Sequence, residues 1–561
     1  MAEEPLLEVH ELAVRYGSLP AVNWASFSLE RNRVLGIVGE SGSGKSTLIW
    51  ALTRLLPDVA TITSGSVYFE GQDLLRLPPD QLRRLRGTRI SYISQDPMSA
   101  LTPALPIGQQ MMDVLYREPW SQKEKWSRCI DALDWVSLPD PAARMKMYPY
   151  ELSGGQRQRV SIAMALMLEP DLVIADEPTT ALDATLEVEI LDLLRRLQHE
   201  TESAVIFVTH HLGVVSSLCD DVLVMNHGDI VEAGPVPEVF ANPAHDYTRM
   251  LLRCDPARIE QPTRRLPSMA DDLAKPVKIV SGPKDRVKAD QAPVLDVANL
   301  CVNFTKPDML PKWLGGRPQL IRAVRDVSLS VRKGETLALV GESGSGKTTI
   351  ARSVLGLVGA DSGSVTVTGR TVDRGNSQVL KSVRACTSMM FQDPVGSLSP
   401  RVTIGEQILE PLIVQGRRDL DRRETLNRLL TNVGLPVSFA SRYPHQLSGG
   451  QARRVGVARA LALDPELIIA DEPTAGLDVS VQGEVLNLLN EIQERTGVSI
   501  LIITHNMSVV RHCADRVVVL LKGEVVETGP CARIFDAPQH DYTRALIAAS
   551  QHELPEFSET E

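Results

Sequence analysis

The chain has 561 residues, and its 43% hydrophobic and 23% charged residues are typical of a folded globular protein rather than a disordered or fibrous one. A net charge of -11 argues against a general nucleic-acid binder, although it leaves room for a local basic patch. No segment approaches the ~20 consecutive apolar residues that a membrane span needs, and the acidic start MAEEPLLEVHE lacks the layout of a secretion signal.

From the N-terminus, the first strong element is an apolar strand over 33–40, which leads through a glycine-rich turn into a predicted helix over 46–56. Further short apolar strands follow, and a second glycine-rich turn again leads into a predicted helix. Apolar strands that alternate with helices predict an α/β fold, in which both faces of a parallel sheet are covered. The further predicted segments are 171–177, 204–210, 335–342, 348–358, 466–472 and 498–505.

The chain is an internal duplication, because GESGSGK, LSGGQ, IADEPT and HDYTR each occur twice. From LSGGQ to HDYTR the copies align without gaps at a spacing of 295 residues. We therefore predict one domain at 1–254 and a second at 293–550, with an acidic tail at 551–561. The proline-rich, charged linker at 255–292 has the composition of an extended, poorly ordered tether. Residues 306–319 are predicted to form a surface loop that is inserted in the second copy.

Each copy carries the pattern G-x-x-x-x-G-K-[ST] between a strand and a helix, at 39–46 and 341–348. Glycines in such a loop let backbone N–H groups cradle a polyphosphate, and the helix N-terminus adds a positive end. Two matches in the right context make a chance glycine-rich turn a poor alternative. The expected ligand-binding residues are Gly39, Ser41, Gly42, Gly44, Lys45, Ser46 and Thr47, and Gly341, Ser343, Gly344, Gly346, Lys347, Thr348 and Thr349.

An apolar strand in each copy ends in Asp-Glu, at Asp176-Glu177 and Asp471-Glu472. Next to a phosphate-binding loop, the aspartate is expected to hold a Mg²⁺ ion together with Ser46 or Thr348. The glutamate is expected to act as the general base that polarises the attacking water. The structural alternative is that each acidic pair only caps a helix.

The recurring LSGGQ resembles the signature of the ATP-binding-cassette ATPases, and the chain resembles two such nucleotide-binding domains in tandem over about 1–250 and 293–550. The resemblance implies two P-loop NTPase domains, each a RecA-like core with a helical subdomain and an antiparallel β subdomain. It also implies ATP and Mg²⁺ as cofactors, with ATP sandwiched between the phosphate loop of one copy and the signature of the other. The implied signature contacts are Ser153, Gly154, Gly155 and Gln156, and Ser448, Gly449, Gly450 and Gln451.

The same resemblance assigns two further pairs of residues. Tyr16 and Phe304 match the aromatic that stacks on adenine, although either could be an ordinary core aromatic. Gln95 and Gln392 match the glutamine that senses Mg²⁺ and contacts the permease, whereas an isolated glutamine is usually a solvated side chain.

Asp183 and Asp478 match the loop that communicates across the nucleotide-binding dimer. His210 and His505 match the histidine that contacts the γ-phosphate, against the alternative of structural histidines; both lie 33 residues after the glutamate of their copy. His211 is the weaker candidate beside His210. Because every motif is intact in both copies, we predict that both composite sites hydrolyse ATP.

Two segments after the glutamines, 95–110 and 392–407, resemble the peptide and nickel importer branch of this family, as does HDYTR. HDYTR could alternatively be a polar helix start without specific meaning. The branch implies two different integral-membrane permease subunits and an extracytoplasmic binding protein as partners, with one copy of this chain per transporter on the cytoplasmic face of the inner membrane. Peptides are the expected cargo, while the sequence leaves nickel complexes and glutathione open. Some relatives carry an iron–sulfur cluster after this helix, but only Cys254 lies nearby, so we predict none.

Other classes of protein share tandem cassettes. Translation factors typically have a long, charged, helical linker, whereas this linker is broken by prolines and close to neutral, so we expect no nucleic-acid partner. A DNA-repair cassette protein would need inserted zinc cysteines. Sugar and drug transporters remain alternatives. The seven cysteines are scattered without a C-x-x-C pair, which favours reduced, mostly buried thiols.

Overall fold

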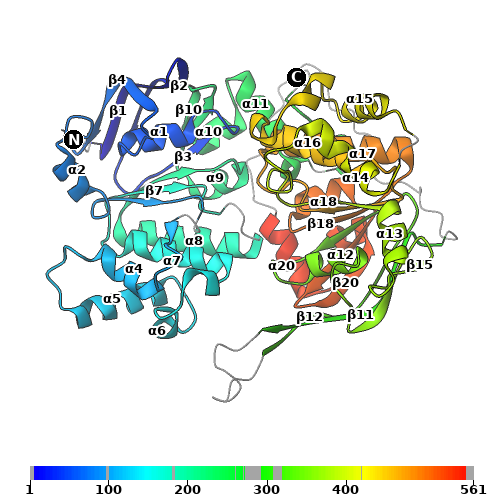
Figure 1. The fold of residues 1–561 in the computed structure, drawn as a ribbon. Helices are drawn as coiled ribbons and strands as arrows, with labels where there is room; N and C mark the ends of the chain where they lie inside the picture. The colour runs from blue at the N-terminus through cyan, green and yellow to red at the C-terminus, as the bar shows by residue number, and fades with distance from the viewer. Residues whose placement is uncertain are drawn as a thin grey trace. The chain divides into compact units, whose positions relative to one another are not determined.

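The computed structural model of the chain describes residues 5–96, 100–179, 184–259, 261–269, 271, 292–306, 319–417 and 420–550. The chain divides into two compact units, and the boundary between them lies between Arg258 and Ile259 (Figure 1). The start of the predicted linker therefore belongs to the first unit and residues 259–271 to the second. The tail at 551–561 and most of the loop predicted at 306–319 lie outside the described residues.

The first unit is built on a six-stranded sheet with the order β10-β9-β3-β8-β7-β6, in which only β10 is antiparallel to its neighbour. An antiparallel sheet with the order β2-β1-β4-β5 is the second layer. The strands are β1 Leu7–Tyr16, β2 Leu19–Leu29, β3 Val34–Val38, β4 Ala60–Phe69, β5 Gln72–Asp73, β6 Ile90–Ile93, β7 Leu172–Asp176, β8 Ala204–Val208, β9 Asp221–Asn226 and β10 Asp229–Pro235. The helices are α1 Lys45–Leu52, α2 Pro79–Leu85, α4 Ile107–Val114, α5 Gln122–Trp135, α6 Pro141–Arg144, α7 Gly154–Leu166, α8 Ala184–Thr201, α9 Leu212–Leu218, α10 Val236–Ala241 and α11 Asp246–Arg253, with short 3-10 turns at Pro149–Glu151 and Pro256–Arg258.

The second unit repeats this plan, with sheets ordered β16-β17-β18-β13-β19-β20 and β12-β11-β14-β15. Its strands are β11 Leu295–Lys306, β12 Gln319–Val331, β13 Thr336–Val340, β14 Ser362–Val367, β15 Arg370–Thr371, β16 Thr387–Met390, β17 Leu467–Asp471, β18 Ser499–Thr504, β19 Arg516–Leu521 and β20 Glu524–Pro530. Its helices are α12 Lys347–Val354, α13 Ser377–Cys386, α14 Ile404–Val414, α15 Arg422–Asn432, α16 Gly449–Ala460, α17 Val479–Thr496, α18 Met507–Cys513, α19 Cys531–Asp536 and α20 Asp541–Ser550, with 3-10 turns at Val437–Ser441 and Pro444–Gln446. The predicted α/β architecture with a parallel sheet in each copy is confirmed.

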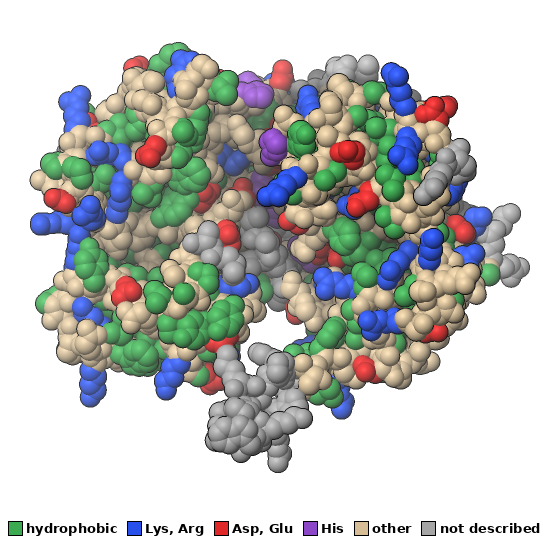
Figure 2. Space-filling model, in the orientation of Figure 1, with side chains coloured by type: hydrophobic (Ala, Val, Ile, Leu, Met, Phe, Trp, Pro, Cys, Tyr) green, Lys and Arg blue, Asp and Glu red, His purple; other side chains and the backbone are tan. Residues whose placement is uncertain are grey.

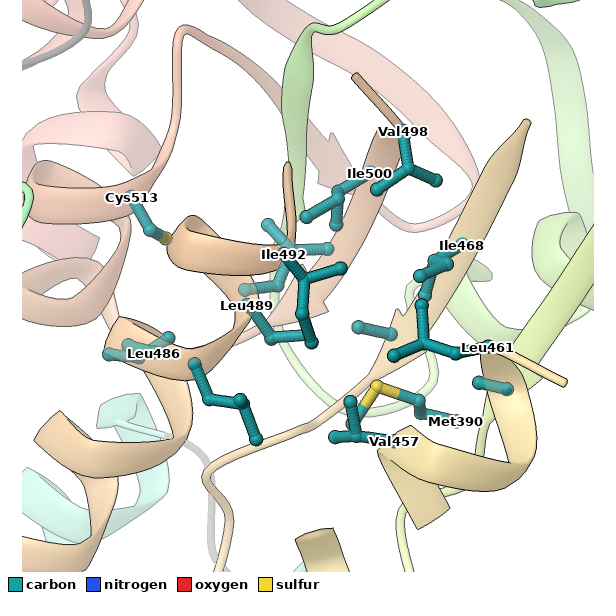
Figure 3. Packing of buried hydrophobic residues seen from close by; sticks show 14 of the residues in the cluster. Met390, Val457, Leu461, Ile468, Leu486, Leu489, Ile492, Val498, Ile500 and Cys513 are labelled. Carbon is teal, nitrogen blue, oxygen red and sulfur yellow. The ribbon is translucent and has the colours of Figure 1, made fainter. Parts of the chain in front are cut away.

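Strands β3, β7 and β8 are buried along their whole length, which explains why their sequences are runs of apolar residues without alternation. The equivalent strands of the second unit are buried in the same way. Figure 3 shows part of the main core of that unit, where Leu489 and Ile492 of α17 meet Ile468 of β17 and Ile500 of β18. Truncating one such buried leucine to alanine typically costs about 2–5 kcal/mol of folding free energy.

The sheet order brings the predicted chemistry to one edge. In the parallel order β3-β8-β7-β6, the phosphate loop follows β3, His210 follows β8, Glu177 follows β7 and Gln95 follows β6. Carboxyl ends of neighbouring parallel strands meet at the same edge of a sheet, which is where α/β proteins bind ligands. No helix in the part of the chain that the structure describes has the length and apolar character of a membrane span. The seven cysteines are free and five are buried, as expected.

Candidate active sites

The phosphate loop of the first unit has a shape that only glycine permits at two positions. Gly39 has φ 151°, and a Cβ there would lie 2.2 Å from the carbonyl oxygen of Met225. Gly44 has φ 105°, and its Cβ would lie 2.3 Å from a carbonyl oxygen in β2. The Lys45 ammonium lies back over the loop and donates to the carbonyl oxygens of Gly39 at 2.7 Å and Glu40 at 3.0 Å.

The second unit builds the same loop. Gly341 and Gly346 have φ 147° and 104°, and the Lys347 ammonium donates to the carbonyl oxygens of Gly341 at 2.6 Å and Glu342 at 2.7 Å. Helices α1 and α12 begin at these lysines, and neither helix start receives a side-chain cap. Their first backbone N–H groups are therefore left for an anion, as a polyphosphate-binding loop requires.

The aspartate after each strand is deeply buried. Asp176 is 3% exposed, and its Oδ2 accepts from the Tyr92 hydroxyl at 2.7 Å, while its buried Oδ1 has no partner among the described residues. Asp471 is 4% exposed and its Oδ1 accepts from the Thr348 hydroxyl at 3.4 Å. Burial, reinforced by the charge of the adjacent glutamate, raises the pKa of both aspartates. A buried carboxylate with an open oxygen beside a loop hydroxyl fits a Mg²⁺ ion.

The adjacent glutamates face the predicted histidines. Glu177 and Glu472 have φ 45° and 49°, a left-handed conformation that costs a non-glycine residue about 1–3 kcal/mol. Gln95 Nε2 donates to Glu177 Oε2 at 2.7 Å, and His210 Nδ1 lies 3.3 Å from Glu177 Oε1. His505 Nδ1 lies 2.9 Å from Glu472 Oε1. The two strained backbones thus aim each carboxylate at its histidine, as a general base beside a γ-phosphate contact would require.

The remaining polar candidates differ between the units. Gln392 is exposed, and its side chain makes no hydrogen bond to Glu472 in the part of the chain that the structure describes. Asp478 is 9% exposed at the start of α17, whereas Asp183 lies outside the described residues. The His211 ring packs edge-on against the His210 ring, with centroids 4.5 Å apart, and its Nδ1 lies 3.5 Å from Glu187 Oε1 rather than beside Glu177.

Both signature serines are helix N-caps. The hydroxyl of Ser153 accepts from the N–H of Gln156 at 3.3 Å, and the side chain of Gln156 accepts from the N–H of Ser153. Ser448 and Gln451 form the same reciprocal capping box. Each hydroxyl uses its lone pair for the cap and keeps its proton for donation, so a cap and an anion contact are compatible.

The two candidate adenine residues are not core aromatics. The Tyr16 hydroxyl lies 3.5 Å from the hydroxyl of Thr47, which places this ring beside α1. Phe304 is 42% exposed on β11. Tyr16 is partly exposed, and a ring that is open to solvent on one face is suited to stacking on a base.

Three supporting contacts were not predicted from the sequence. The indole N–H of Trp50 donates to the Tyr92 hydroxyl at 3.0 Å, which in turn donates to Asp176. Arg453, 4% exposed, donates to the carbonyl oxygens of Glu472 at 2.9 Å and Ala475 at 2.6 Å. Only the position of Arg453 next to the signature could have signalled such a role.

The third contact lies at HDYTR. The hydroxyls of Tyr247 and Tyr542 accept from the phosphate-loop N–H groups of Glu40 at 3.0 Å and Glu342 at 2.9 Å. The motif is therefore more than a polar helix start. Nothing in its composition indicates a contact with a loop about 200 residues away.

The sequence of the chain matches the model of a known protein family. The ABC transporter model matches residues 22–180 and 324–475, which together are more than half of the chain. The chain belongs to the ABC transporter ATP-binding proteins. Transport ATPases of this kind hydrolyse ATP, so the chain is an ATPase with two such domains. A second model, the oligopeptide/dipeptide transporter C-terminal region, matches this ABC protein at 231–283 and 526–556.

Several curated ABC proteins resemble the chain along nearly its whole length. The glutathione import ATP-binding protein GsiA of Pectobacterium atrosepticum is 41% identical, over 98% of this chain and 90% of that protein. The peptidoglycan transport ATP-binding protein YejF of Agrobacterium fabrum is 40% identical, over 98% of this chain and 96% of that protein. Among solved structures, the ATP-binding cassette MJ0796 bound to ADP and Pi is 30% identical with a TM-score of 0.37, over 42% of this chain and 98% of that one.

Proposed function

We propose that this ABC protein is the ATP-hydrolysing subunit of an importer for peptides or closely related small molecules. The observation that carries the proposal is the oligopeptide/dipeptide C-terminal region after both ATPase domains. Relatives that cover nearly the whole chain are named for the import of glutathione, a tripeptide, and for peptidoglycan transport, which supports a peptidic cargo.

Each site is proposed to use its residues in the following way. Lys45 and Lys347 leave the loop carbonyls to bind the β- and γ-phosphates, together with the uncapped N–H groups of α1 and α12. A bound Mg²⁺ would be held by Ser46 and Asp176, or Thr348 and Asp471, with Gln95 and Gln392 nearby, and would neutralise phosphate charge.

Glu177 and Glu472 are proposed to accept a proton from the attacking water, while His210 and His505 donate a hydrogen bond to the γ-phosphate. Ser153 and Ser448 are proposed to complete the site of the opposite unit, so that two ATP molecules are bound by paired units. Both sites are proposed to hydrolyse, because each unit has its full set of residues.

The proposed partners are two different permease subunits and an extracytoplasmic binding protein, with the chain peripheral at the inner face of the cell membrane. A nucleic-acid partner is the alternative from another class. On the face shown in Figure 2, lysine and arginine side chains are interspersed with acidic ones rather than gathered by sign, which disfavours it for that face.

Affinity purification of the tagged chain from gently solubilised native membranes tests this proposal. We expect two multi-span proteins to co-purify, and the reconstituted complex to increase its ATPase rate when a binding protein loaded with di- or oligopeptides is added. Co-purification of ribosomal proteins, or stimulation by a sugar-binding protein alone, would overturn it.

A further inference from the structure

The contact between HDYTR and the phosphate loop is the same in both units. The Glu40 N–H donates to Tyr247, while the Glu40 carbonyl accepts from Lys45. In the second unit the corresponding contacts join Glu342 to Tyr542 and Lys347. One residue of each phosphate loop is thus held from both sides, by the tyrosine and by the phosphate-binding lysine.

The tyrosine is itself held in place by local hydrogen bonds. Glu232 accepts from the N–H groups of Ala244 at 2.7 Å and His245 at 3.1 Å, and His245 Nδ1 accepts from the N–H of Tyr247 at 3.1 Å. Tyr247 is 7% exposed. The second unit repeats every step of this network with Glu527, Gln539, His540 and Tyr542. Because the Tyr247 ring is buried, the Tyr542 ring is partly buried and both helix starts are fixed, each hydroxyl is presented to its loop with little freedom.

We propose that Tyr247 and Tyr542 are positioning residues that set the affinity of each phosphate loop for ATP. The loop binds phosphate with backbone N–H groups, so their directions depend on how firmly its peptide planes are held. The tyrosine fixes one plane and leaves the reacting atoms untouched. This inference deepens the proposed ATPase function and rests on it.

The test replaces each tyrosine by phenylalanine in the full chain, which removes the hydroxyl and keeps the ring. Losing one hydrogen bond of this kind predicts an increase of about three- to tenfold in both the KM for ATP and the Kd of a fluorescent ATP analogue, with kcat within about twofold. Tyr116→Phe is the matched control, because Tyr116 is 66% exposed.

The outcomes separate this inference from the proposed function. If the unmodified chain neither binds nor hydrolyses ATP, the proposed function fails. If it does both, and the phenylalanine variants have unchanged KM and Kd or lose kcat alone, the positioning role is wrong.

A second, independent observation concerns the linker. Residues 263–268, here termed the docked segment, lie on α17 of the second unit. Asn487 accepts from the N–H of Leu266 and donates to its carbonyl oxygen, both at 2.8 Å, and Asn490 donates to the carbonyl oxygen of Arg264 at 2.8 Å. Two asparagines therefore hold the backbone of the segment as a neighbouring strand would.

Further contacts extend the docked segment to α18. His512 Nδ1 accepts from the N–H of Thr263 at 3.2 Å, and Leu266, 2% exposed, belongs to the main core of the unit. A Cβ at Gly483 would lie 2.8 Å from the carbonyl oxygen of Pro267, so the glycine makes room for the segment. The segment thus ties α17 to α18.

The first unit does not offer this surface. At the spacing of 295 residues, the residues that contact the segment are replaced by others of different size or charge. Arg195 instead donates to the carbonyl oxygen of Ser217 at 2.6 Å and pairs with Asp192 at 3.2 Å. Glu494 also contacts the segment, since it accepts from the Arg264 guanidinium at 2.9 Å. The replacements for Gly483, Asn487, Asn490, Glu494 and His512 are Val188, Asp192, Arg195, His199 and Ser217.

We infer that the docked segment, together with Ile259, which packs against the same core, anchors the start of the linker on the second unit, so that the chain passes between the units at Arg258–Ile259 without a long tether. The chain after the segment, 272–291, then joins two points of the same unit and does not set how far the units can separate. A short tether keeps the effective concentration of one unit near the other high.

Amide hydrogen exchange on the full chain tests the anchor. Asn487→Asp installs the residue of the first copy. The aspartate cannot donate to the Leu266 carbonyl oxygen and places a negative charge beside it, so we expect the Leu266 amide to exchange about tenfold faster. The matched control Asp192→Asn should leave this rate unchanged. Equal exchange in the Asn487→Asp variant and the unmodified chain would overturn the anchor.

A pair of insertions tests the tether. Twenty glycine and serine residues inserted between Arg258 and Ile259 lengthen the connection between the units and lower the effective concentration of one unit near the other. We expect this variant to need more ATP for half-maximal turnover, and the same insertion within 272–291 to change it by less than twofold. Equal effects of the two insertions would contradict the inference.

Discussion

The two units carry the same motif residues, but different neighbouring residues orient them. In the first unit the metal-site aspartate is held by Tyr92, which Trp50 holds in turn. In the second unit the equivalents of these residues are Met389 and Arg352, so the aspartate has no tyrosine donor at this position; the loop hydroxyl, Ser46 or Thr348, contacts the aspartate in both units. The comparison shows that the motif residues define the site, while the residues that orient them can be exchanged between copies.

The loops that follow Glu177 and Glu472 differ in the same way. In the second unit Arg453 holds two carbonyl oxygens of the segment 472–475, whereas the first unit has Gln158 at this position. A buried guanidinium that makes two hydrogen bonds is expected to hold its loop more firmly than an amide. Burial lowers the pKa of Arg453, and the negative charges of Asp393 and Glu472 partly oppose this shift.

The largest expected effect comes from removing the phosphate-loop lysines. Lys45→Ala and Lys347→Ala should each lower ATP turnover by about a hundredfold or more, because each removes a cation that balances the transferring phosphate. Steady-state ATPase assays on the purified chain measure this effect. Turnover above a tenth of normal in either variant would show that this unit does not contribute a required site.

A smaller effect is expected at Arg453, which holds the loop after Glu472. Arg453→Gln, which installs the residue of the first copy, should reduce turnover by about tenfold, because two buried carbonyl oxygens lose their donors. The nucleotide Kd of a fluorescent analogue should change less than the turnover. A variant with normal turnover would mean that the two loops are equally firm without the arginine.

The smallest effect is expected at Tyr92 and Trp50, the residues that orient Asp176 in the first unit. Tyr92→Phe should weaken Mg²⁺-dependent ATP binding by about three- to tenfold, since Asp176 loses one hydrogen bond. Trp50→Phe, one step further from the carboxylate, should cost about twofold or less. Titration of Mg²⁺ at fixed ATP distinguishes them. An effect of Trp50→Phe as large as that of Tyr92→Phe, or larger, would contradict this ranking of the two residues.

Much of the site follows from the sequence, because the motifs lie at the carboxyl ends of short apolar strands that form one parallel sheet. Glu177, His210 and Gln95 meet for that reason alone. The helical and antiparallel subdomains came from family resemblance rather than from periodicity.

Contacts that depend on tertiary structure could not be predicted. Tyr92 lies in the four-residue strand ISYI, whose pattern is that of an ordinary buried strand. Tyr247 reaches a loop that is distant in sequence. The docked segment was predicted as part of an extended, poorly ordered tether, because a proline-rich stretch with little apolar periodicity gives no sign that asparagines elsewhere hold its backbone.

The central claim is that both sites hydrolyse ATP despite their different supports. The most direct measurement compares Glu177→Gln and Glu472→Gln in the full chain, by turnover and by the amount of ATP retained after rapid desalting. We predict that each variant retains unhydrolysed ATP and loses turnover by about a hundredfold or more, as expected for loss of a general base. Normal turnover in either variant would contradict the account, because it would show that one site binds ATP without hydrolysing it.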